Sequence, residues 1–141
     1  QTLLHNLTTA AKQGVTTTGN AARGYASAVG VAPTNFYIAP SQESVEAMLA
    51  RMGEGFLITE VSGLHAGANQ ISGDFSLLAK GFAVRGGQKA EPVEQITVAG
   101  NFFAVLKDVV AVADDLAFGL PGGSLVGSPT IWVKALSVAG K

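Results

Sequence analysis

The two histidines, His5 and His65, are the first residues to test for metal chemistry. A zinc hydrolase places two histidines about one helical turn apart and adds a third ligand, as in the HExxH pattern. His5 and His65 lie in distant parts of the chain, and neither belongs to an HExxH or HExxxH sequence. The chain has no cysteine to supply a thiolate ligand. We therefore predict no metal ligand and no cofactor in this chain, with a two-histidine site built from distant loops as the alternative.

The sequence also contains no complete motif for nucleophilic or acid–base catalysis. Gly123 to Gly127 reads GSLVG, which misses the GxSxG elbow by one residue, and no suitably flanked histidine follows it. The same glycine-rich segment lacks the Lys-Ser/Thr of a phosphate-binding loop. Asp114 and Asp115 are adjacent, and on a helix adjacent side chains point about 100° apart, so these carboxylates would not converge on one bond. We predict no catalytic residue.

Polar residues at two predicted strand ends form the remaining candidate cluster. Thr59-Glu60 lies at the end of one strand, and Asp74 begins the next. If these ends are neighbours, Glu60 and Asp74 share one rim with the connecting loop, residues 62–73. The alternative, which we favour, is that Asp74 ties this loop through backbone N–H groups, as aspartate does in turns. For His65 in the loop, we favour a solvated side chain over a functional one.

The elements that carry these residues lie between positions 53 and 101. Three runs have strand composition: Phe56–Val61, Phe75–Arg85 and Lys89–Ala99. The second and third meet at Gly86-Gly87, a two-residue turn typical of antiparallel hairpins. Long ordered loops on a sheet often carry function, which makes residues 62–73 the segment of most interest.

Two amphipathic helices are expected around this sheet. Ser41 is a candidate N-cap for a helix with apolar residues at helical spacing that ends at Gly53. Asn101 is the expected cap of a second helix, which continues to Leu116 and carries Asp114-Asp115 in its last turns, where the helix dipole disfavours anions.

The other segments are shorter or irregular. We expect a short strand passing into a helical turn (2–12, stopped by Gly14), an irregular surface or interface segment (14–33), a strand (35–39), a glycine-rich loop (119–129) and a final strand (130–138). The element order predicts one α+β domain over residues 1–141, a mostly antiparallel sheet with two amphipathic helices packed on it.

Composition limits the class of partner. Of 141 residues 13% are charged and 48% apolar, and the mean hydropathy is +0.34, which suggests a surface partly covered by a partner or by more of the same chain. The net charge of −1 comes from scattered residues, so we expect no nucleic-acid binding.

The uncharged run 116–133 contains Pro121 and Pro129, so we expect no membrane span. Gln1 is not an initiator methionine, so we expect a piece of a longer chain whose N-terminal region is absent.

Several sequence blocks together resemble the C-terminal domain of the TldD/PmbA family. In order they are TGNAARG (18–24), PTNFYI (33–38), GFLITEVSG (55–63), NQISGDFSLLAKGF (69–82), EPVEQITVAGN (91–101) and VVAVADDLAF (109–118). GDFS together with PVEQITVAGN is quite specific, and the resemblance runs nearly end to end. Members of this family are described as proposed modulators of DNA gyrase, and better as metalloprotease subunits.

The resemblance implies a two-subunit cytoplasmic peptidase. A TldD-like subunit carries HExxxH and a cysteine ligand in the late glycine-rich loop, and so holds zinc. A PmbA-like subunit, also called TldE, lacks these ligands and shapes the peptide channel. The late loop of this chain has no cysteine and is short, as in the PmbA-like branch.

The resemblance assigns this chain peptide-contacting or partner-contacting residues instead of catalytic ones. The partner is a TldD-like subunit, a second copy, or both, and the substrate is an unfolded peptide. Two alternatives stay open: a structural dimerisation or interaction domain of the gyrase-modulator type, and an autonomous metallopeptidase whose ligands all lie in a preceding region. The candidate contact residues are Asn20, Arg23, Thr59, Glu60, His65, Asn69 and Asp74.

Overall fold

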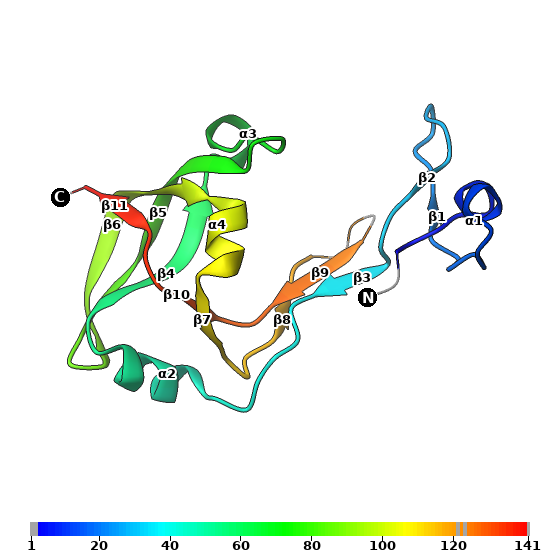
Figure 1. The fold of residues 1–141 in the computed structure, drawn as a ribbon. Helices are drawn as coiled ribbons and strands as arrows, with labels where there is room; N and C mark the ends of the chain where they lie inside the picture. Colours follow the sequence, from blue (N-terminus) through cyan, green and yellow to red (C-terminus); the bar gives the residue numbers. More distant parts are fainter. Residues whose placement is uncertain (1–2, 121, 123, 141) are drawn as a thin grey trace. The chain divides into compact units, whose positions relative to one another are not determined.

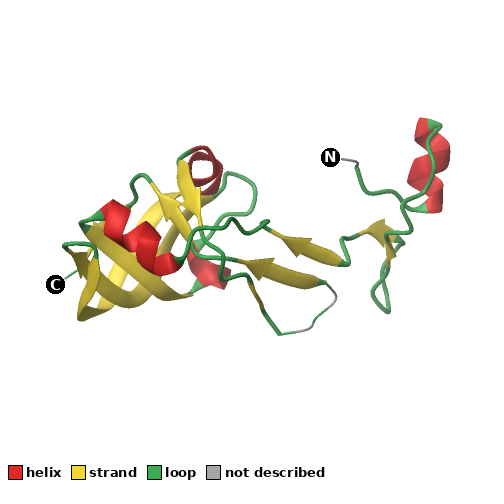
Figure 2. Cartoon of the chain, turned by 90° about the horizontal axis from the view of Figure 1, so that it is seen from below, coloured by secondary structure: helices red, strands yellow, loops and turns green. Residues whose placement is uncertain are grey.

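The computed structural model describes residues 3–120, 122 and 124–140. The chain divides into two compact units (Figures 1 and 2). The first unit comprises residues 1–39 and 116–128, and the second comprises residues 40–115 and 129–141. The predicted single domain over residues 1–141 stays a prediction, because a division by contacts does not show whether the units fold separately.

An antiparallel four-stranded sheet is the centre of the second unit, and it confirms the predicted fold class. Its strands are β4 (Gly55–Ser62), β5 (Asp74–Arg85), β6 (Gln88–Asn101) and β11 (Ser137–Ala139), in the order β11-β6-β5-β4 (Figure 1). All neighbouring strands in this sheet run antiparallel. Because side chains alternate along a strand, Leu77 and Ala79 face the buried side, while Leu78 and Lys80, which alternate with them, are exposed.

The hydrophobic core lies on one face of this sheet. Leu77, Ala79, Ile96 and Val98 form the buried cluster, and partly buried side chains from Ile58, Phe75 and Val93 pack against it. The helix α2 (Val45–Met52) contacts β6 and buries its Met48 and Leu49. Full burial of a side chain of this size contributes about 1.5–3 kcal/mol, so these buried residues stabilise the second unit.

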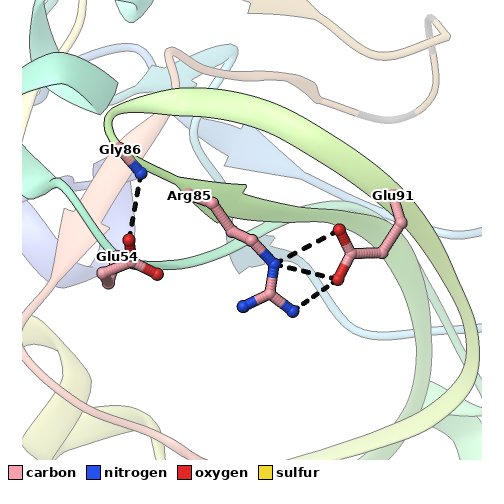
Figure 3. A network of polar contacts seen from close by, with 4 residues as sticks. All are labelled: Glu54, Arg85, Gly86 and Glu91. Atoms are coloured by element: carbon pink, nitrogen blue, oxygen red, sulfur yellow. Dashed lines mark hydrogen bonds and ion pairs between the residues drawn. The ribbon is translucent and has the colours of Figure 1, made fainter.

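The predicted β5–β6 hairpin is confirmed and is fastened to the end of α2. Gly86 and Gly87 both have positive φ, 56° and 77°, as a two-residue hairpin turn requires. The Gly86 N–H donates to the Glu54 carboxylate at 3.0 Å, and the Gly87 N–H donates to the Gly53 carbonyl at 2.8 Å. Beside the turn, Arg85 forms an ion pair with Glu91 (Figure 3).

Helix α2 begins later than predicted. Its N-cap is Ser44, whose side chain accepts from the Ala47 N–H, whereas the sequence favoured Ser41. The Ser41 hydroxyl instead donates to the Val112 carbonyl and accepts from the Glu43 N–H. The predicted C-terminal glycine, Gly53, is confirmed, with a φ of 74°.

The predicted helix from Asn101 to Leu116 is wrong in its second half. Asn101 does cap α4 (Phe102–Lys107), but β7 (Val109–Val112) follows immediately. Three of its four residues are valines, and β-branched side chains favour a strand when a partner strand is present. Asp114 and Asp115 are therefore not in a helix. The Asp115 carboxylate instead accepts from the N–H and hydroxyl of Thr130, at 2.8 and 2.7 Å.

The predicted final strand, 130–138, is two strands in different sheets. β10 (Ile131–Val133) pairs antiparallel with β7, and β11 pairs antiparallel with β6. The break falls at residues 134–136, after a last hydrogen bond from the Lys134 N–H to the carbonyl of Asp108, the residue before β7.

The first unit consists of short elements with little buried apolar surface. They are α1 (Leu7–Gln13), β1 (Ala21–Ala22), β2 (Gly30–Val31), β3 (Asn35–Tyr37), β8 (Ala117–Phe118) and β9 (Leu125–Ser128). β1 pairs antiparallel with β2. β9 pairs in parallel with β3 and antiparallel with β8.

Three predictions for the first unit need correction. Residues 3–6 form no strand before α1, because the Asn6 side chain already caps that helix by accepting from the Thr9 N–H. The predicted end of this helix at Gly14 is confirmed. The segment 14–33 contains the β1–β2 pair. The predicted loop 119–129 contains β9. Its pairing with β3, a strand distant in the sequence, cannot be read from the loop itself. Pro121 and Gly123 of this loop lie outside the described residues.

Two further features concern the helices. A short helix, α3 (Leu64–Gly67), lies within the predicted loop 62–73. The described part of the chain thus has four short helices in place of the two predicted. None of the helices in residues 3–120, 122 and 124–140 has the length and apolar character needed to cross a bilayer.

Candidate functional site

Strand β4 forms one edge of the four-stranded sheet and can pair with another chain. It pairs with β5 on one side, and among the described residues no strand pairs with its other side. Its last four residues, Thr59 to Ser62, are all exposed. A strand edge of this kind presents free N–H and C=O groups that an extended peptide can pair with.

Two bulges meet at Lys80 of β5. On the β4 side, Ile58 pairs with Gly81 and Glu60 with Lys80, which leaves Thr59 as an extra residue. On the β6 side, Ala79 pairs with Ile96 and Gly81 with Val93, so two residues of β6 face Lys80. Bulges bend a strand and redirect its side chains, and they are frequent beside functional sites.

The β6 bulge requires an unusual backbone at Gln95. This residue has a φ of 55°, the left-handed region that side chains other than glycine and asparagine rarely adopt. Such a conformation costs on the order of 1–3 kcal/mol and persists only where the surrounding structure holds it.

The β4 bulge in turn depends on Gly81. A Cβ atom at Gly81 would lie 2.0 Å from the Leu57 carbonyl oxygen, so only glycine allows β4 to approach this closely.

Lys80 lies among acidic side chains on the exposed face of the sheet. Its Nζ is 2.9 Å from the Glu60 carboxylate. The hydrogen bond to Glu60 and the charge of Glu60 raise the pKa of Lys80, and the charge of Glu94 raises this pKa further. Lys80 is therefore a fully charged cation held next to two carboxylates.

A hollow of about 250 Å³ lies around these three charged residues. Its wall combines polar and charged side chains with the exposed Leu78. The lining residues are Glu60, Val61, Ser62, Leu78, Ala79, Lys80, Glu94 and Gln95. We call this hollow the β4 pocket, because it adjoins the free edge of β4.

The loop before β5 is held by a network of hydrogen bonds centred on Asn69, Asp74 and Asn101. The Asn69 Oδ1 accepts from the N–H groups of Ile71 and Ser72, at 2.9 and 3.1 Å. The Asn69 N–H donates to the Asp74 carbonyl at 2.8 Å. The Asn101 Nδ2 donates to the Asp74 carboxylate at 2.7 Å, while its Oδ1 caps α4.

This network explains the role of the Asp74 carboxylate in the loop. Hydrogen bonds from Asn101 and then Ser72 lower the pKa of the Asp74 carboxyl below its usual value. Asp74 does tie the loop, as favoured, but the prediction that backbone N–H groups donate to its carboxylate is wrong, because the donors are the side chains of Asn101 and Ser72. Asn69 also has a structural role in the loop.

The predicted shared rim of Glu60 and Asp74 is wrong. Glu60 pairs with Lys80, whereas Asp74 pairs with Asn101 at the far end of β5. At about 3.3 Å per residue, these two positions along β5 are roughly 20 Å apart. The loop 62–73 therefore spans a long stretch of the sheet, and its two ends do not form one cluster.

The other predicted contact residues lie in separate places. Thr59, at the β4 bulge, donates to the Lys80 carbonyl at 3.3 Å, and His65 is exposed on α3. Asn20 and Arg23 belong to the first unit. Asn20 fastens the chain there, because its side chain donates to the Ala32 carbonyl at 3.2 Å, and Arg23 is exposed just after β1. Of the seven predicted residues, only Glu60 lines the β4 pocket, and Thr59 precedes it in β4.

The sequence analysis did not identify Lys80, Glu94 and Gln95. One signal for them exists: Gly81 inside an otherwise apolar strand indicates a bulge. The adjacent polar pair Glu94-Gln95 also interrupts the alternation between Val93 and Ile96. Pairing across the sheet, which brings these residues to Lys80, depends on the register and cannot be read from either strand alone.

The other histidine, His5, is buried in the first unit. Its carbonyl accepts from the N–H and hydroxyl of Thr18, and its Nδ1 has no hydrogen-bond partner in the part of the chain that the structure describes. Across residues 3–120, 122 and 124–140, no three His, Cys, Asp or Glu side chains lie close enough to share a metal ion.

Comparisons with known proteins agree on one family. The family model described as the PmbA/TldA metallopeptidase C-terminal domain matches residues 1–140. Metalloprotease PmbA homolog of Haemophilus influenzae is 46% identical over 70 residues, which cover 50% of this chain and 15% of the relative. Metalloprotease PmbA of Escherichia coli is 40% identical over 82 residues, which cover 58% of this chain and 18% of the relative.

Solved structures show the same fold. A proposed modulator of a DNA gyrase from Thermotoga maritima superposes with a TM-score of 0.84 at 44% identity, over 99% of this chain and 30% of that one. TldE from Thermococcus kodakarensis superposes with a TM-score of 0.77 over 93% of this chain and 29% of that one, and at 22% identity it shows the fold alone. The chain spans less than a third of the length of each of these four relatives.

Proposed function

Because the chain belongs to the PmbA/TldA metallopeptidase C-terminal domain family, we propose that it is part of a PmbA-like subunit that holds unfolded peptides for a metal-bearing partner. The single observation that carries this proposal is the free edge of β4 in a domain of a metallopeptidase family. The complex is of the TldD/PmbA type, acts in the cytoplasm, and processes or degrades its peptides by hydrolysis.

Pairing with β4 explains why the substrate must be unfolded. An extended peptide can match its main-chain N–H and C=O groups to those of β4, and each hydrogen bond contributes about 0.5–1.5 kcal/mol net. A folded protein has already paired these groups within its own structure. This mode requires no specific side chain on the protein, so it is compatible with a domain for which we predict no catalytic residue.

The proposal assigns the zinc ion to a TldD-like partner. The family resemblance implies that the catalytic subunit carries HExxxH and a late-loop cysteine. The corresponding glycine-rich segment of this chain, residues 119–129, contains no cysteine. In this proposal the chain contributes peptide binding and contact with the partner, and the partner performs the hydrolysis.

Casein cleavage by mixed subunits tests this function. The parent protein of this chain is assayed alone, with a TldD-like subunit, and with that subunit inactivated in HExxxH, and the TldD-like subunit is also assayed alone. We expect cleavage only with the intact TldD-like subunit. Equal cleavage by the TldD-like subunit with and without the parent protein would contradict the helper role.

The alternative is a dimerisation or interaction domain with no proteolytic role. The exposed aromatic side chains of β3 favour it, since Phe36 is 64% exposed and Tyr37 is 52% exposed. Large exposed apolar residues that lie together often mark a protein contact. Stable association with the TldD-like subunit or with a second copy, without any change in casein cleavage, would support this alternative.

A further inference from the structure

The two edges of the four-stranded sheet differ in how well they can pair with another strand. On the edge opposite β4, β11 pairs only with Thr97–Ala99 of β6 among the described residues, and the earlier part of β6 contains Pro92. Proline has no N–H to donate and hinders pairing at a strand edge. β4 contains no proline and no lysine, and its one charged side chain, Glu60, forms an ion pair with Lys80. The composition of β4 thus leaves its edge available to a peptide.

The apolar side chains of β4 on the core face of the sheet are Phe56, Ile58 and Val61. Residues directly opposite each other in an antiparallel pair project from the same face. The β5 residues opposite these three are small and buried: Ala83, Gly81 and Ala79. Ala79 belongs to the buried core cluster, and Ile58 packs against that cluster. The core face therefore continues across β4 to the free edge.

The core is incomplete at this edge. Phe56 is 46% exposed and Val61 is 40% exposed, although the β5 residues opposite them are buried. Among the described residues, no strand beyond β4 covers their outer sides. A strand added at the usual spacing of about 4.8 Å would lie directly beside these side chains. Apolar side chains of the added strand would extend the core by one row.

The other face of β4 is polar toward the C-terminal end of the strand. Glu60 lies opposite Lys80, to which it is ion-paired at 2.9 Å, and Ser62 lies opposite the exposed Leu78. An added strand would have Glu60 and Ser62 as its nearest neighbours on this face. Polar side chains of the added strand would remain hydrated there. The two faces of β4 therefore suit different side chains.

We propose that β4 selects extended peptides in which apolar residues occupy alternate positions and fall on the core face. This inference rests on the proposed function and adds a substrate preference to it. Side chains of a paired peptide alternate between the two faces of the sheet. β5 already meets Phe56, Ile58 and Val61 with alternate residues, and an added peptide meets them in the same way.

This preference defines a class of substrate. Alternating apolar and polar residues are typical of strands that are half buried in folded proteins. In a folded protein such a segment is paired within its own sheet, and unfolding releases it. β4 would therefore select segments that unfolded proteins expose and folded proteins do not.

Peptide binding measured by fluorescence anisotropy tests this inference. The parent protein is titrated into three dye-labelled heptapeptides of equal net charge. One has three valines at alternate positions among polar residues, one has the same valines in a row, and one has threonine at each valine position of the first. Threonine keeps the branched shape of valine and changes its polarity.

The alternating valine peptide should bind most tightly. We expect it to bind about three- to tenfold more tightly than the threonine peptide, the range of two or three cross-strand apolar contacts. The peptide with valines in a row should lie between them, because at most two of its valines fall on one face.

Substitutions in the parent protein locate the preference on β4. Val61→Thr keeps a β-branched side chain at a partly exposed position, so β4 should stay folded while the preference falls about twofold or more. Phe56→Thr should act in the same direction. Val110→Thr is the matched control, since it makes the same substitution at a valine that is 48% exposed on β7, in the β10–β7 sheet. It should leave the preference unchanged.

Equal affinity for the three peptides, or equal effects of Val61→Thr and Val110→Thr, would overturn the inference. No binding of any peptide would contradict both the preference and the proposed holding of peptides, as expected if a second copy or another part of the parent chain covers β4. Casein cleavage by the mixed subunits with equal peptide affinities would reject only the preference. A preference for alternating valines without cleavage by the mixture would reject only the helper role.

Discussion

Asn101 combines two roles in the second unit, as a helix cap and as a hydrogen-bond donor to the loop before β5. Its Oδ1 accepts from the N–H groups of Phe103 and Ala104 and so caps α4. Its Nδ2 donates to the Ser72 carbonyl and the Asp74 carboxylate. One side chain thus connects the end of β6, the start of α4 and the loop before β5.

Two substitutions of Asn101 should distinguish its role as helix cap from its role as donor to Asp74. Asn101→Ala loses the cap and the donor, so we expect a loss of about 1–2 kcal/mol in the free energy of unfolding. Asn101→Ser keeps a hydroxyl that can cap the helix but lacks the amide donor, so it should lose less stability. In both variants the pKa of the Asp74 carboxyl should rise toward 3.8, because its main donor is gone. Urea denaturation and NMR titration of the carboxyl carbon measure the two effects.

The sign of the pH dependence follows from this lowered pKa. A carboxyl whose pKa is lower in the folded protein adds stability above its unfolded pKa and loses it as the pH falls through the folded value. The native protein should therefore lose part of its stability as the pH falls below about 4, the unfolded pKa of aspartate. Asn101→Ser should show a smaller loss in this range. An equal loss in both proteins would mean that Asp74 is not stabilised by Asn101.

At the scale of elements, the position of β4 against β5 depends on Gly81. Two bulges flank Lys80, and at the first of them the Leu57 carbonyl lies where a side chain at position 81 would begin. The strands can keep this register only if the residue after Lys80 has no side chain. The free edge of β4 and the β4 pocket both depend on this contact.

Gly81→Ala should therefore displace β4. Because the clash is with backbone atoms, which cannot move aside as a side chain can, we expect a loss of about 1–3 kcal/mol in the free energy of unfolding. Gly119→Ala is the control, since among the described residues a Cβ there would have only the Val126 carbonyl as a neighbour, at 3.7 Å. Thermal or urea denaturation of the two variants provides the comparison. Equal stabilities would mean that β4 does not pack as described.

The sequence predicted those elements whose signals are local. The hairpin at Gly86-Gly87, the end of α2 at Gly53 and the cap at Asn101 all depend on glycine or asparagine at a fixed position, and all are confirmed. The predictions for Val109–Val112 and for residues 130–138 were wrong because the pairing of β7 with β10 is non-local. The pocket was missed for the same reason, since bulges depend on the register between strands.

At the scale of the whole molecule, the first unit exposes more apolar surface than its short strands can cover. Phe36 of β3 and Val126 of β9 are paired residues on neighbouring strands, and both are more than half exposed. Tyr37 and Phe118 meet edge to face, with ring centroids 5.8 Å apart. Because successive side chains of a strand point to opposite faces, Phe36 and Val126 lie on one face of the β3–β9–β8 sheet, and Tyr37 lies on the other. Exposed apolar side chains on both faces favour association with a partner or a second copy.

The isolated 141-residue chain should therefore self-associate. Analytical ultracentrifugation should show dimers or larger species, and Phe36→Ser combined with Val126→Ser should shift the distribution toward monomer. Tyr25→Ser is a suitable control, because Tyr25 is fully exposed in the segment between β1 and β2. A native chain that sediments as a monomer at all concentrations would contradict this prediction.

The central claim is that this chain holds peptides for a zinc-bearing partner and does not bind zinc itself. The most direct measurement is the zinc content of the parent protein, purified alone, together with its casein cleavage alone and after mixing with a TldD-like subunit. We predict no stoichiometric zinc and no cleavage alone, and cleavage in the mixture. Stoichiometric zinc together with cleavage by the parent protein alone would show that it contains a complete catalytic site, and would contradict the account.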